Sequence, residues 1–141
     1  GMHYEAAAAD LALARGDPRR ARRHVEKFLA SAERTRSRRY LVRGGRQLAA
    51  IEMAEGRPSE AERRLESVTA DARSLGNPAQ LWTSLLAHAR VLHALGRSDE
   101  AAATGREARS LLDGLRSGLA GEVARGLESS TPYALAAELG G

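Results

Sequence analysis

Apolar residues recur along most of this chain at the three- and four-residue intervals typical of helices with one buried face. The clearest stripe lies between Pro18 and Thr35 and consists of Ala21, Val25, Phe28, Leu29 and Ala32. Comparable stripes predict further helices over residues 4–15, 38–55, 58–75, 78–95 and 98–115. The segment from Pro78 to the glycine at position 96 is the most apolar, so we expect it at the centre of the core. The pattern as a whole predicts an all-α fold.

The predicted helices are grouped by a repeat of 40 residues. The turn glycines Gly16, Gly56 and Gly96 keep this spacing without slippage. Two alanine columns keep it as well: Ala9, Ala49 and Ala89, and Ala21, Ala61 and Ala101. Each glycine is expected to end a helix in the left-handed conformation, with a proline or serine starting the next helix two residues later. The repeating unit is therefore a helix, a tight turn and a second helix, as in helical repeat arrays.

This unit resembles the tetratricopeptide repeat family, whose repeats carry small residues where the alanine columns fall and bulky apolar residues later in the second helix. The matching bulky positions are Val25, Phe28, Leu65 and Val68. The third copy departs from the family with Gly105 and Ala108, and the period exceeds the usual ~34 residues. The resemblance covers roughly residues 4–115, and it is nearest to the long-period variety in the C-terminal regions of large bacterial ATP-dependent regulators.

The resemblance implies a right-handed superhelical array that serves as a non-catalytic scaffold in bacterial signalling or transcription regulation. We expect one domain, residues 1–141, with repeats at about 2–37, 38–77 and 78–117. Residues 118–141 are expected to cap the array, because a terminal element usually covers the last apolar face. The apolar residues assigned to this lid are Leu119, Val123, Leu127, Tyr133, Leu135 and Leu139.

Gly44 and Gly45 interrupt the apolar stripe of the predicted helix 38–55. One interpretation is a close approach of two backbones, or a notch for a ligand. The other, which we favour slightly from sequence, is a frayed first turn, because each glycine costs a helix roughly 1 kcal/mol relative to alanine.

The composition limits the possible chemistry. The chain contains no cysteine, which excludes disulfides and thiolate metal sites, and its four histidines do not share a helix face. No phosphate-binding loop or nucleophile elbow is present. No apolar run reaches the ~20 residues of a membrane span, and the N-terminus lacks the layout of a secretion signal. We therefore expect a cytoplasmic protein that is not an enzyme, with neither a cofactor nor a metal.

The charges are distributed unevenly. Residues 1–47 contain eleven arginines and Lys27 against five acidic residues, whereas the remainder contains ten basic and thirteen acidic residues. This asymmetry is compatible with an anionic partner, but we favour the interpretation that the arginines are solvated on exposed helix faces. Nucleic-acid binding through this basic third is disfavoured, because Tyr4 and Tyr40 are the only aromatic residues nearby that could stack on bases.

The family reads its ligands in the concave groove lined by the first helix of each pair. Carried onto this sequence, the groove residues are Arg43, Arg46, Met53, Thr83, Leu86, Arg90 and His93. Arginines there can hold carboxylates through paired hydrogen bonds, so we predict a protein partner with an acidic or C-terminal peptide segment. The alternative is that the arginines are solvated or paired with local acids. A further possibility is a homodimer through the alanine-rich helix predicted at residues 4–15.

Overall fold

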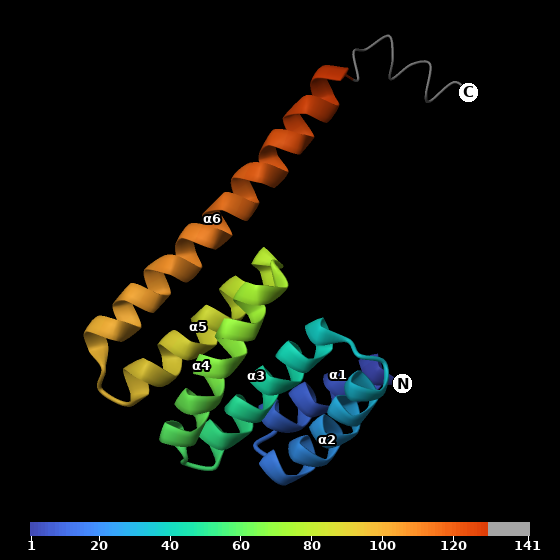
Figure 1. Cartoon of the computed structure of the whole chain (residues 1–141), viewed down its shortest axis with the longest axis vertical. Helices are drawn as coiled ribbons and strands as arrows, with labels where there is room; N and C mark the ends of the chain where they lie inside the picture. Colours follow the sequence, from blue (N-terminus) through green and yellow to red (C-terminus); the bar gives the residue numbers. More distant parts are fainter. Residues whose placement is uncertain (130–141) are drawn as a thin grey trace.

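The computed structural model describes residues 1–129, which form six α-helices. They are α1 (Met2–Ala14), α2 (Pro18–Arg34), α3 (Arg38–Ala54), α4 (Pro58–Leu75), α5 (Pro78–Ala94) and α6 (Ser98–Ser129). Each odd-numbered helix packs against the even-numbered helix that follows it, and the three pairs stack in chain order (Figure 1). The prediction of an all-α array of three helix pairs is therefore confirmed.

The turn inside each pair has the same conformation. Gly16, Gly56 and Gly96 have φ angles of 75°, 74° and 76°, respectively. In the first turn the amide of Gly16 donates to the carbonyl of Leu13, and the amide of Asp17 donates to that of Ala12. Equivalent bonds occur at the other two glycines. These are Schellman turns, which need a residue in the left-handed region and so explain the glycine column.

The connections between pairs also share a register. Arg36 and Gly76 lie 40 residues apart, and both end a helix in the left-handed region, with φ angles of 53° and 69°. The next residue then caps the following helix: Ser37 accepts a hydrogen bond from the amide of Tyr40, and Asn77 accepts one from the amide of Gln80. Arg36 is the single residue other than glycine with a positive φ among the described residues.

Replacing Arg36 with glycine is expected to raise the free energy of unfolding by about 1 kcal/mol, since glycine removes the Cβ penalty of the left-handed region. Arg36 is exposed, so the substitution removes no core packing. Chemical denaturation measures the change. Arg36→Ala removes the same charge but retains a Cβ, and it is expected to give no gain; an equal gain in both variants would attribute the effect to charge.

The predicted end of the sixth helix near Leu115 is wrong, because α6 continues without a break to Ser129. Arg116 lies 40 residues after Gly76 and so occupies the position at which Arg36 and Gly76 end their helices, but it lies inside α6. Arg36 at the equivalent position does end a helix, so the residue type alone does not decide the outcome. The glycines near Arg116 weaken a helix without ending it.

The extension of α6 does not form the predicted lid. Leu119, Val123 and Leu127 are 63%, 56% and 67% exposed, respectively, on a helix that projects beyond the other five (Figure 1). Their expected role in covering the last pair is thus wrong. The remaining lid residues, at positions 133, 135 and 139, lie outside the described residues.

The core runs through all three pairs instead of centring on α5 as expected. The largest fully buried side chains include Phe28 of α2, Ile51 of α3, Leu65 of α4 and Leu92 of α5. Each pair contributes to a local cluster against its neighbour, which is the normal arrangement in a stacked array.

Gly44 and Gly45 lie within α3 and are buried, so the frayed first turn is wrong and the close approach is right. A Cβ on Gly44 would overlap the side chain of Leu29 in α2, and one on Gly45 would lie 2.5 Å from Cγ2 of Val68 in α4. The two glycines therefore let α3 lie close to α2 on one side and to α4 on the other.

Candidate functional site

A hollow of about 280 Å³ lies between α3 and α5. Its apolar part is formed by Ala49, Leu65 and Val91, which are all buried. Its remaining lining residues are Arg46, Ala50, Met53, Ala87 and Arg90. The structure thus brings together three of the predicted groove residues, namely Arg46, Met53 and Arg90.

Arg46 is held in place by the neighbouring helix. Its Nη1 donates to Oε1 of Gln80 at 2.8 Å and to Oγ of Ser84 at 3.2 Å, both on α5. Burial, and then the nearby charge of Arg43, lower the pKa of Arg46 to about 10, while Asp10 acts in the opposite direction. Arg46 consequently remains a cation at neutral pH, but it has fewer water contacts than an exposed arginine.

Arg43 does not line this hollow. It faces α1, where its Nη2 lies 3.6 Å from Oδ2 of Asp10. The same carboxylate accepts a hydrogen bond from Nε2 of Gln47, which also donates to the carbonyl of Ala6. For Arg43, therefore, pairing with a local acid describes the structure better than a free position in a groove.

Arg90 differs from Arg43 and Arg46 in its surroundings. It is exposed and has no ion-pair partner among residues 1–129. It also borders a second hollow, which lies between α5 and α6 and includes His93. Arg90 is thus the predicted groove arginine that remains available for an external anion.

Two further predicted residues lie apart from the hollow. Thr83 donates through Oγ1 to the carbonyl of Ala79 in its own helix, at 2.7 Å. Leu86 is half-buried and does not line the hollow between α3 and α5.

The sequence reasoning missed the residues that shape the site from neighbouring elements. Gln80 and Ser84 fix the position of Arg46, and Leu65 of α4 provides part of the floor. The burial of Leu65 was predictable from its stripe, but its place under the α3–α5 hollow depends on how the pairs stack.

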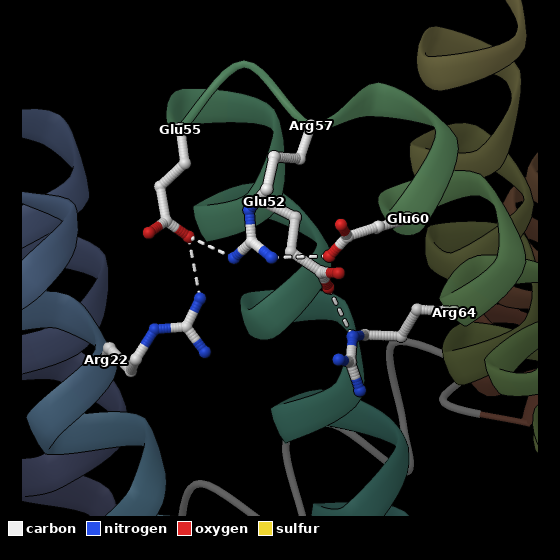
Figure 2. A network of polar contacts seen from close by, with 6 residues as sticks. All are labelled: Arg22, Glu52, Glu55, Arg57, Glu60 and Arg64. Carbon is white, nitrogen blue, oxygen red and sulfur yellow. Dashed lines mark hydrogen bonds and ion pairs between the residues drawn. The ribbon is translucent and has the colours of Figure 1, made fainter.

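Several other arginines are committed to an ion-pair network that joins α2, α3 and α4 (Figure 2). Arg22 lies 2.6 Å from Oε1 of Glu55, and Arg57 lies 2.8 Å from the same oxygen while also pairing with Glu60. Hydrogen bonds from Arg57 and then from Arg22 lower the pKa of Glu55. Part of the arginine excess thus joins repeats to one another.

In the same region Arg64 of α4 donates through Nε to Glu52 of α3. The two side chains, whose contact is drawn in Figure 2, differ in exposure. That of Glu52 is 3% exposed and that of Arg64 is 39% exposed. Burying a carboxylate is costly unless it is paired. Arg64 is the ion-pair partner of Glu52 in the part of the chain that the structure describes.

The described residues contain no cluster of three or more histidine or acidic side chains that could hold a metal ion. None of the described helices has the length and apolar character needed to cross a membrane.

The hollow between α3 and α5 is lined by cationic side chains beside small apolar ones. This combination suits the recognition of an anionic group on a partially apolar ligand.

Residues 2–27 and 82–107 match the tetratricopeptide repeat. This match supports the tetratricopeptide repeat family. The two matched segments start two 40-residue periods apart, and each covers most or all of the first helix of a pair and the start of the second. Neither a curated protein nor a solved structure matches the chain significantly. Tetratricopeptide repeats generally mediate protein–protein interactions and are typically non-catalytic scaffolds.

Proposed function

We propose that this chain binds an acidic or C-terminal peptide segment in the hollow between α3 and α5. The observation that carries the proposal is that two arginines line the same hollow above a buried apolar floor. Arg90 is exposed and without an ion-pair partner among the described residues, and Arg46 is held in position by hydrogen bonds. The general role of tetratricopeptide repeats in binding other proteins supports the class of ligand.

The two arginines contribute in different ways. Arg46 is oriented by Gln80 and Ser84, so it loses little side-chain freedom when a carboxylate binds. Arg90 is exposed and can move toward the ligand. A planar guanidinium can donate two parallel hydrogen bonds to one carboxylate, which favours arginine over lysine at such a position.

The apolar part of the hollow sets the size of the ligand group. A volume of about 280 Å³ accommodates one or two side chains and lies below the range of most small-molecule sites. Met53 provides an adaptable apolar contact beside the buried floor. We therefore propose that the ligand combines a carboxylate with an adjacent apolar side chain.

Replacing Arg90 with alanine is expected to reduce peptide affinity at least tenfold, as the loss of a charge-assisted hydrogen bond implies. A displayed library of peptides with free C-termini and internal acidic segments selects the ligand, and fluorescence anisotropy on a selected peptide measures its Kd. Arg106→Ala is the matched control, because Arg106 is an exposed arginine of α6 that lies outside the hollow.

Equal affinities for the wild type, Arg90→Ala and Arg106→Ala would reject the hollow as the binding site. Nucleic-acid binding through the basic N-terminal third is the competing function. It would appear as tight binding to random-sequence DNA that weakens steeply with salt and is unchanged by Arg90→Ala.

A further inference from the structure

The 40-residue register shows which positions of an odd-numbered helix pack against the preceding pair. In α3 these positions include Gly44, Gln47 and Ile51, and all three are buried. In α5 the first and last of them are Ser84 and Val91, which are also buried. The same positions in α1 have no preceding pair to cover them among the described residues.

The uncovered positions of α1 are Tyr4, Ala7 and Leu11, and we name them the head face. Tyr4 is 66% exposed and Leu11 is 50% exposed. Together with Ala8 they border a hollow of about 390 Å³ between α1 and α2. Tyrosine and leucine thus occupy positions that are buried at both inner junctions.

The opposite end of the array carries the other half of such a junction. A hollow of about 540 Å³ is lined by residues of α5 and α6, and we name its lining the tail face: Ala89, Arg90, His93, Ser98, Ala101 and Ala102. The residues one period earlier include Ala49, Ala61 and Glu62, which are buried at the junction with α5. The tail face therefore corresponds to the surface that receives the next helix pair.

We infer that copies of this chain associate head to tail, with the head face of one copy packed on the tail face of another. The head face and the tail face correspond to the two surfaces that meet at each of the two inner junctions. A second copy of the chain therefore offers the tail face a surface of the kind that packs there within the array. The contact is heterologous, and contacts of this kind extend from copy to copy unless a rotation closes them into a ring.

One pair of charged positions agrees with this contact. At the inner junctions an even-numbered helix packs against the odd-numbered helix that follows it, so head-to-tail contact places α6 of one copy beside α1 of the next. Ala50 of α3 and Arg90 of α5 line the same hollow at the second inner junction. One period later these positions are Arg90 of one copy and Asp10 of the next, which carry opposite charges.

The inner junctions also indicate how strong this contact is. The first inner junction contains the ion pair of Arg22 with Glu55 at 2.6 Å, and the second contains the ion pair of Arg97 with Glu62 at 2.7 Å. The position of Glu62 in the tail face is taken by Ala102, so this ion pair has no counterpart between copies. We therefore expect a reversible association that depends on concentration.

Sedimentation velocity on the full chain over a range of concentrations tests the inference, with variants that disable one face each. Leu11→Asp places a charge in the head face, and Ala102→Arg places a large side chain in the tail face. Both positions are partly or fully exposed, so the fold is expected to persist, and circular dichroism checks it. Leu119→Asp, on the extension of α6, is the matched surface control.

For the wild type and Leu119→Asp, we expect the average mass to rise with concentration and to exceed that of a dimer. Each face variant alone is expected to remain a monomer. Mixing the two face variants is the decisive step, because one intact head and one intact tail remain, and the mixture is expected to form a dimer that grows no further. A wild type that stays monomeric would overturn the inference. The inference would also be overturned if Leu119→Asp abolished association. The same holds if Leu11→Asp lost association while Ala102→Arg associated as the wild type does.

Discussion

Replacing Arg64 with methionine is expected to lower the free energy of unfolding by about 3 kcal/mol, because it leaves a buried carboxylate without its partner. The side chain of Glu52 is 3% exposed, so water cannot replace the lost ion pair. Methionine retains much of the apolar stem of arginine, which separates the loss of charge from the loss of packing. Urea denaturation monitored by circular dichroism measures the change.

Two further variants identify the cause. Arg63→Met removes an adjacent, exposed arginine and is expected to change the free energy of unfolding by less than about 0.5 kcal/mol. Glu52→Gln in the Arg64→Met background removes the unpaired charge and should recover most of the loss. If the double variant is no more stable than Arg64→Met, packing rather than the buried charge accounts for the effect.

Replacing Gly45 with alanine is expected to destabilise the protein by about 2 kcal/mol, although alanine favours helices, because the added methyl group overpacks the contact between α3 and α4. The new Cβ would lie 2.5 Å from Cγ2 of Val68. Valine in a helix strongly prefers one rotamer, so Val68 cannot easily turn aside. Thermal unfolding followed by circular dichroism measures the loss.

Gly114→Ala is the control for helix propensity. Apart from the backbone of its own helix, no atom lies within 4 Å of a Cβ at Gly114, so this variant is expected to gain roughly 0.5–1 kcal/mol. Val68→Ala supplies the test of mechanism: in its background the cost of Gly45→Ala should fall, because the obstructing methyl groups are gone. A gain in stability from Gly45→Ala alone would show that α3 can move away from α4.

The helix pairs could be predicted from sequence because their signals are local. Glycine followed two residues later by proline or serine defines a turn through backbone preferences alone, and the turns at Gly16, Gly56 and Gly96 have the predicted left-handed conformation. The Gly76–Asn77–Pro78 junction was equally readable, because each of its residues has a distinct capping role.

The errors concern features that depend on contacts across the fold. Gly44 and Gly45 resemble a weak helix start until the positions of Leu29 and Val68 are known. The length of α6 was missed because Arg116 occupies the junction position without ending the helix, whereas Arg36 at the equivalent position does end one. A single sequence does not show which of these two outcomes its packing favours.

The candidate site was predictable in part for the same reason. The groove positions of the family that the sequence resembles placed Arg46 and Arg90 on the first helices of two neighbouring pairs, and both residues line the hollow between α3 and α5. The partners that distinguish Arg43, Arg46 and Arg90 belong to other repeats, so only the structure separates the paired Arg43 from the exposed Arg90.

The continuous α6 also has a mechanical consequence. At a rise of about 1.5 Å per residue, the helix carries the chain about 21 Å from Leu115 to Ser129. Its far end therefore has both a set distance and a set angular phase relative to the array. Adding a single residue within this span would advance that end by about 1.5 Å and rotate it by about 100°, so the helix acts as a spacer whose length also determines direction.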